Sequence, residues 1–179
     1  MRNCRLCLLI LLWLLAFPAL VTADIQFGVG CMIQTTPFYN KLVQAGVFEI
    51  PAMGLANPRP MPLLFKMARS FRYESDKTRR DWWQSADQTS QYFSGDCEDK
   101  AIWLYTQMRR NGYHDASLHI GKYSPSSRKF HMWVTYVADD GSTLLLDPTI
   151  QRKPWNILAF SENFYRSLHI LNGSDCVSL

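Results

Sequence analysis

Hydrophobic and polar positions alternate most regularly between residues 97 and 147. After Gly95, apolar residues recur every three or four positions, which is the spacing of one helix face. Asp96 is a favoured N-cap, and Asn111-Gly112 is a typical helix stop. The pattern predicts a helix over residues 97–110, with an inward stripe of Cys97, Ala101, Leu104, Tyr105 and Met108.

Three strands are predicted after this helix, over residues 117–123, 129–138 and 142–147. Successive side chains of a strand point to opposite sides of the sheet. One face of the second strand therefore carries Phe130, Met132, Val134 and Tyr136. The other face carries His131, Trp133, Thr135 and Val137.

The turn between the second and third strands predicts how they pair. Its sequence is Asp-Asp-Gly over residues 139–141, which suits a type I turn closed by a left-handed glycine. A three-residue loop of this kind pairs Trp133 with Asp147. His131 and Asp147 then become diagonal neighbours on one face, about 7–8 Å apart between backbones and within reach of each other's side chains. A two-residue loop would put them on opposite faces.

The flanking segments carry weaker patterns. Prolines interrupt residues 24–62, which we expect to wrap around the rest of the chain. Apolar spacing predicts a helix over residues 63–71, and a shorter helix capped by Ser161 is predicted over residues 161–169. Helices combined with an antiparallel sheet give an α+β fold, and we expect residues 24–179 to form one domain.

The N-terminus has the pattern of an export signal. Arg2 and Arg5 precede an apolar run, and Val-Thr-Ala at 21–23 offers the small residues that a signal peptidase reads. Cleavage would remove residues 1–23 and leave a periplasmic or secreted domain with no stable membrane span. The run is about 16 residues, short of the roughly 20 that cross a bilayer. An uncleaved N-terminal anchor is the alternative.

Charge and cysteine usage narrow the classes of function. Loss of Arg2 and Arg5 with the signal lowers the formal net charge from +4 to +2, which favours no nucleic-acid partner. Three cysteines stay in the mature chain, and an odd number in an oxidising compartment suggests one disulfide and one free thiol. Cys31 and Cys176 would form the disulfide, with two buried thiols as the alternative. In either case Cys97 stands apart.

A thiol at the first turn of a helix suits nucleophilic chemistry. The positive end of the helix dipole favours the thiolate, and a neighbouring imidazole favours it further. With His131 as base and Asp147 orienting that base, Cys97 has the arrangement used in acyl transfer. The backbone N–H of Cys97 would help to hold the oxyanion. A second donor is expected just upstream; the segment offers Trp82, Trp83, Gln84 and Tyr92, of which we take Trp83 and Gln84 forward.

Three short segments resemble the transglutaminase-like superfamily. They are Ser-Gly-Asp-Cys-Glu-Asp-Lys-Ala at 94–101, His-Met-Trp-Val at 131–134 and Leu-Asp-Pro-Thr at 146–149. The Gly-Asp-Cys-Glu-Asp form is especially similar to the bacterial transglutaminase-like cysteine proteinases. The resemblance covers roughly residues 81–149. It implies a papain/transglutaminase-like core, in which a nucleophile helix packs on an antiparallel sheet, with Cys97, His131 and Asp147 as catalytic residues.

The same resemblance suggests a calcium ion, held by acidic residues around the cysteine at Asp96, Glu98 and Asp99. Three carboxylates beside a thiol oppose its ionisation, and a bound hard cation relieves that repulsion. The alternative is that these acids only cap the helix and complement its dipole. The acyl-transfer chemistry itself requires no cofactor.

These features together predict an exported cysteine protease or amidase that acts on a protein or peptide through a thioester. Transamidation, in which a glutamine side chain is joined to an amine, is the alternative activity. A binding module that keeps the fold without turnover is the alternative class of protein. Resemblance of fold does not set the substrate.

Overall fold

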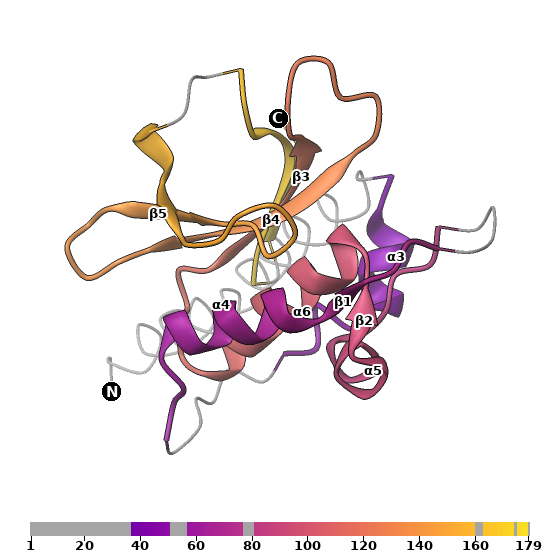
Figure 1. The fold of residues 1–179 in the computed structure, drawn as a ribbon, viewed down its shortest axis with the longest axis horizontal. Helices are drawn as coiled ribbons and strands as arrows, with labels where there is room; N and C mark the ends of the chain where they lie inside the picture. The colour runs from indigo at the N-terminus through magenta and orange to yellow at the C-terminus, as the bar shows by residue number, and fades with distance from the viewer. Residues whose placement is uncertain (1–36, 51–56, 77–80, 160–162, 174, 179) are drawn as a thin grey trace, which may run out of the picture.

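The computed structural model describes residues 37–50, 57–76, 81–159, 163–173 and 175–178. In these ranges a six-stranded antiparallel sheet carries the helices against one face (Figure 1). The expected α+β class is confirmed. The predicted signal peptide and Cys31 lie outside the described residues, as does the side chain of Cys176, so the predicted disulfide falls outside them too.

Four α-helices precede the sheet in the described part of the chain: α3 (Tyr39–Gln44), α4 (Met61–Ser70), α5 (Ala86–Tyr92) and α6 (Cys97–Arg110). The helix predicted over residues 97–110 is confirmed at both ends, and α4 confirms the helix predicted over residues 63–71. The sequence pattern missed α5. Its start is a capping box, in which Ser85 Oγ accepts from Gln88 N–H at 3.3 Å and Gln88 Oε1 accepts from Ser85 N–H at 2.9 Å.

The main sheet has the strand order β6-β5-β4-β3-β7-β8. Its strands are β3 (Ser117–Lys122), β4 (His131–Val137), β5 (Thr143–Leu146), β6 (Trp155–Asn156), β7 (Arg166–Asn172) and β8 (Asp175–Ser178). The helix predicted over residues 161–169 is wrong where it overlaps β7. This segment pairs with β3, whose free main-chain groups would otherwise lie at an open sheet edge.

The predicted pairing of β4 with β5 is confirmed. Val134 pairs with Leu146 and Val137 with Thr143, and the Ala138 N–H donates to the Ser142 carbonyl at 2.8 Å. Gly141 has a φ of +79°, the left-handed conformation that the loop requires. Continued by one residue, this register places Trp133 opposite Asp147.

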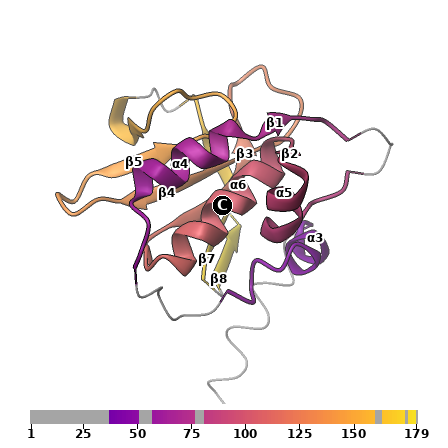
Figure 2. The ribbon, with the colours of Figure 1, turned by 60° about the horizontal axis from the view of Figure 1, so that its bottom comes forward.

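Helix α6 is the centre of the helical layer. It lies between α4 and α5 and packs on β4 (Figure 2). Its apolar residues join those of the inner sheet face in one core, whose sheet members include Leu118, Ile120, Met132, Val134 and Leu146. The outer face has a smaller cluster around Trp133, Leu145 and Tyr165. Among the described residues, no helix combines the length and apolar character needed to cross a membrane.

A short parallel pair of strands, β1 (Arg72–Tyr73) and β2 (Ser94–Gly95), leads into α6. The N–H of Glu74 donates to the Gly95 carbonyl at 3.1 Å, which ties the segment after α4 to the residues just before Cys97. Residues far apart in the sequence therefore meet at the N-terminus of α6.

Candidate active site

Cys97 is the first residue of α6, and its neighbours fix the start of that helix. Asp99 folds back so that its carboxylate accepts from Asp96 N–H at 3.2 Å and from Gln84 N–H at 2.8 Å. This fold-back requires glycine at position 95. A Cβ there would lie 2.5 Å from Asp99 Cβ, closer than real carbon atoms approach.

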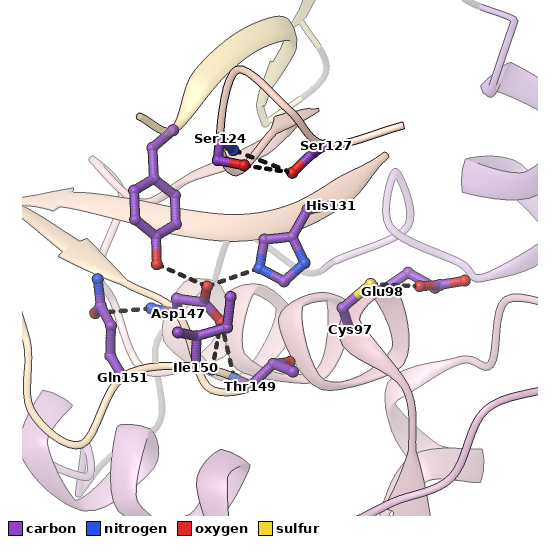
Figure 3. A network of polar contacts seen from close by, with 10 residues as sticks. Cys97, Glu98, Ser124, Ser127, His131, Asp147, Thr149, Ile150 and Gln151 are labelled. Atoms are coloured by element: carbon purple, nitrogen blue, oxygen red, sulfur yellow. Dashed lines mark hydrogen bonds and ion pairs between the residues drawn. The ribbon is translucent and has the colours of Figure 1, made fainter. Parts of the chain in front are cut away.

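His131, at the start of β4, is hydrogen-bonded to Asp147, which follows β5. Its Nε2 lies 2.7 Å from Asp147 Oδ2. The hairpin register brings the two residues together, because both project from the same face of adjacent strands. Figure 3 shows the His131 ring between Asp147 and Cys97.

The carboxylate of Asp147 is completely buried, at 0 % exposed, and is surrounded by donors. Its Oδ1 accepts from the backbone N–H groups of Thr149 and Ile150 at 2.9 and 3.1 Å. Its Oδ2 accepts from the Tyr165 hydroxyl at 2.9 Å as well as lying against the His131 ring. Sequence reasoning missed Tyr165, which lies in a segment predicted to be helical.

Cys97 and His131 line one pocket of about 450 Å³. Aromatic side chains form much of its wall: Phe38, Tyr73, Trp83 and Phe130. The Phe38 ring stacks on Trp83 at 5.5 Å between centroids and meets the edge of Phe130 at 5.1 Å. The thiol and the imidazole thus share a cleft that has both aromatic and acidic sides.

In this structure the Cys97 thiol donates to Glu98 Oε2 at 2.9 Å, and Glu98 lies on the far side of the sulfur from His131 (Figure 3). Burial raises the pKa of the thiol, the negative charge of Glu98 raises it further, and a backbone hydrogen bond from Met132 lowers it. The helix start alone was expected to favour the thiolate. Burial and the adjacent acid act against the helix dipole here.

An acidic cluster lies beside the thiol, formed by Asp76, Asp96 and Glu98. One carboxylate oxygen from each lies within 4.8 Å of the others. Asp96 is only 8 % exposed, and its Oδ1 is buried with no hydrogen-bond partner among the described residues. Burial, followed by the charge of Asp96, raises the pKa of Glu98 to about 9. These carboxylates face one another without enough donors.

Two of the three predicted calcium ligands, Asp96 and Glu98, lie in this cluster, whereas Asp99 lies outside it. The oxygens of Asp99 are occupied by backbone N–H groups. Asp76 takes its place. Asp76 is held by the N–H of Trp82, which donates to its Oδ2 at 2.5 Å, and no local pattern in the sequence marks it as a partner of residue 98.

Two N–H groups of the residues proposed as second oxyanion donors, Trp83 and Gln84, have partners in this structure. Trp83 lines the pocket, but its indole N–H donates to Asp81 Oδ1 at 3.3 Å. The Gln84 N–H is bound to Asp99, and Gln84 is not among the described residues that line the pocket. The backbone N–H of Cys97 lies in the first turn of α6, where helical N–H groups have no partner within the helix.

No protein-family model and no curated protein matches this chain. Two solved structures of LapG from Legionella pneumophila match it at 18% identity. The calcium-bound form has a TM-score of 0.55 over 84% of this chain and 85% of that chain, and the EGTA-treated form has 0.56 over 84% and 83%. The expected fold, in which helices pack on an antiparallel sheet, is therefore confirmed as the fold of LapG. The likeness is one of fold.

Proposed function

We propose that this chain is an exported cysteine protease or amidase that works by thioester acyl transfer. The observation that carries the proposal is the buried His131–Asp147 hydrogen bond of 2.7 Å, beside a thiol at a helix N-terminus in the same pocket. Nucleophile, base and orienting carboxylate are the parts that this chemistry needs. The LapG-like fold supports the same reading.

In the proposed reaction Cys97 Sγ attacks the carbonyl carbon of an amide or peptide bond while His131 takes the thiol proton. The carbon–nitrogen bond then breaks, and His131 returns the proton to the leaving amine. Water, deprotonated by His131, attacks the resulting thioester and releases the acid together with the thiol. Asp147 holds the imidazole in one orientation throughout and balances its charge when it is protonated.

Asp76, Asp96 and Glu98 fit a hard divalent cation such as calcium. Their donors are all carboxylate oxygens, and the unpartnered buried Oδ1 of Asp96 requires compensation. A cation held there would neutralise negative charge beside the Cys97 thiol. That LapG has a calcium-bound structure supports calcium as the ion for this chain.

Alkylation by iodoacetamide tests the thiol and its base. We expect Cys97 to react faster than free cysteine at neutral pH when calcium is present, and His131→Ala to slow the reaction. His114→Ala is the matched control, because His114 is an exposed histidine beyond the end of α6. If Cys97 reacts no faster than free cysteine and His131→Ala changes nothing, the chain is a non-catalytic binding module.

The reaction products separate hydrolysis from transamidation. Protein termini compared between cells with the wild-type chain and cells with Cys97→Ala identify cleaved substrates. Hydrolysis creates new termini that depend on Cys97. Incorporation of a labelled primary amine into glutamine side chains, with no new termini, would establish transamidation instead.

Export is tested separately from chemistry. We expect the chain in the periplasmic or secreted fraction, with a mature N-terminus at Asp24 by mass spectrometry. A full-length chain in the membrane fraction would support the uncleaved anchor.

A further inference from the structure

Tyr165 contacts the candidate active site from the outer face of the sheet. Its hydroxyl donates to Asp147 Oδ2 at 2.9 Å, and the side chain is 7 % exposed. The ring is held edge-on by Trp133 and Tyr123, with 5.3 Å between centroids in both pairs. The hydroxyl is therefore fixed by packing, and it points at the carboxylate that faces His131.

The backbone of Tyr165 supports this placement at some energetic cost. Its φ is +53°, in the left-handed region that side chains other than glycine rarely adopt. Its N–H donates to the Tyr123 carbonyl at 3.1 Å, just before β7 begins. Such conformations persist where the surrounding structure dictates them, and they are concentrated at functional sites.

Tyr165 and His131 share one oxygen atom. Both lie within hydrogen-bond distance of Asp147 Oδ2, whereas Oδ1 is bound by two backbone N–H groups. A donor on a carboxylate draws negative charge toward itself and so weakens the attraction of that oxygen for a neighbouring cation. The phenol therefore competes with the imidazolium for the same charge.

We propose that Tyr165 is a positioning residue that locks Asp147 in place and sets the basicity of His131. This inference rests on the proposed function for its catalytic meaning, but the effect on His131 is a property of the folded chain with or without turnover. Tyr123 lies beside the imidazole, and Lys100 on α6 acts on Asp147. The other titratable groups that line the pocket with His131 are Tyr73, Asp76, Asp81, Asp96, Cys97, Glu98 and Lys129.

Tyr165→Phe in the full chain removes the hydroxyl and keeps the ring. Without this donor more charge stays on Oδ2, so the NMR titration midpoint of the His131 ring should rise by about half a pH unit or more. On a cleaved substrate kcat should fall about tenfold, with KM little changed, because Asp147 loses one of the hydrogen bonds that hold it against His131. Tyr136→Phe is the matched control. Tyr136 lies on the helix-facing side of β4, packed against Tyr113 at 5.2 Å.

A second variant keeps the test decisive if Tyr165→Phe folds poorly. A fluorinated tyrosine at position 165 has a more acidic phenol and donates more strongly, so the His131 midpoint should move down. If neither substitution moves the midpoint relative to Tyr136→Phe, Tyr165 only fills space and the inference is overturned. If the midpoint moves but Cys97 shows no enhanced alkylation, the inference holds and the proposed function fails.

Discussion

Carboxylates lie on both sides of the Cys97 thiol, and the two sides differ in the hydrogen-bond donors that surround them. Asp147, on the sheet side, is completely buried, and each of its oxygens meets two donors. At the start of α6, Asp96 is almost as buried, yet one of its oxygens has no partner among the described residues. Glu98 beside it faces the Cys97 thiol and other acids.

The difference shows that donors, more than burial, decide what an acidic residue does. Buried carboxylates need hydrogen bonds or counter-charges. Asp147 has them within the protein, so it can serve as a fixed support for His131. The cluster of Asp76, Asp96 and Glu98 has too few of them, because Asp96 Oδ1 is buried without a partner among the described residues, so it is suited to take up protons or a cation. The Cys97 thiol therefore lies between Asp147, whose oxygens all have donors, and an acidic cluster whose oxygens, in the described part of the chain, do not all have them.

Removing the charge of Asp147 should give the largest effect. In Asp147→Asn either orientation of the amide sets its NH₂ group against donors: the N–H groups of Thr149 and Ile150 on one side, or His131 and Tyr165 on the other. We expect amide hydrolysis to fall by about 10³–10⁴-fold. The unpaired buried groups should also lower the free energy of unfolding by about 1–3 kcal/mol.

The measurements for Asp147→Asn are kcat on a substrate found by the comparison of termini, and urea denaturation. Asp140→Asn is the control: Asp140 lies in the same hairpin loop, where its Oδ1 accepts from Ser142 N–H at 2.9 Å. A fall of less than tenfold in kcat for Asp147→Asn would show that the fully hydrogen-bonded carboxylate of Asp147 is not needed to support His131.

Local signals explain why much of this fold could be predicted. The bounds of α6 follow from Asp96 and Asn111-Gly112, and the β4–β5 register follows from Gly141. Helix α5 begins with a comparable signal, the capping box at Ser85, but its sequence lacks the apolar periodicity that marks α6. Strand β7 was beyond local prediction, because its conformation depends on pairing with β3 far upstream.

The site divides in the same way. Cys97, His131 and Asp147 stood out by type and spacing, and the structure brings the last two into contact. Asp76 comes from a segment with no predicted element and Tyr165 from a segment wrongly predicted to be helical, and only tertiary packing brings them to the site. Asp99 was predicted as a ligand because it is adjacent in sequence, whereas its oxygens are taken by Gln84 and Asp96 backbone groups.

Calcium should stabilise the chain through the unsatisfied cluster alone. At a concentration of 100 times the dissociation constant, a bound ion adds about 2.7 kcal/mol, and each kcal/mol raises Tm by about 2–4 °C for a chain of this size. Glu98→Gln should abolish the rise in Tm between chelator and calcium. Asp87→Asn, which alters an exposed acid paired with Arg110, should retain it. Equal shifts in both variants would place the ion elsewhere.

Gly95→Ala should disturb Asp99, the acid at the start of α6 whose carboxylate accepts two backbone hydrogen bonds. The new Cβ would displace Asp99, whose Cβ and Oδ2 lie 2.5 and 2.8 Å away, and the two backbone hydrogen bonds to Asp99 would be lost. We expect the free energy of unfolding to fall by about 1–3 kcal/mol. A double-mutant cycle with Asp99→Ala provides the check. Because both changes remove the same bonds, their costs should not add, and full additivity would mean that the clash lies elsewhere.

Stability should also depend on pH. Burial and Asp96 raise the pKa of Glu98 from 4.5 to about 9, so the folded chain binds a proton that the unfolded chain has lost at any pH between these values. More protons bound in the folded state means that stability falls as pH rises through this window. Without calcium, Tm should therefore decline between pH 5 and about 9, and Glu98→Gln should flatten the decline. Saturating calcium should also flatten it, because the ion takes up the charge that the proton would otherwise neutralise. At Asp147, by contrast, the protein supplies the donors, so Asp147→Asn should leave the decline in Tm unchanged. A decline that persists in Glu98→Gln but disappears in Asp147→Asn would show that the unsatisfied charge lies at Asp147 and not in the acidic cluster.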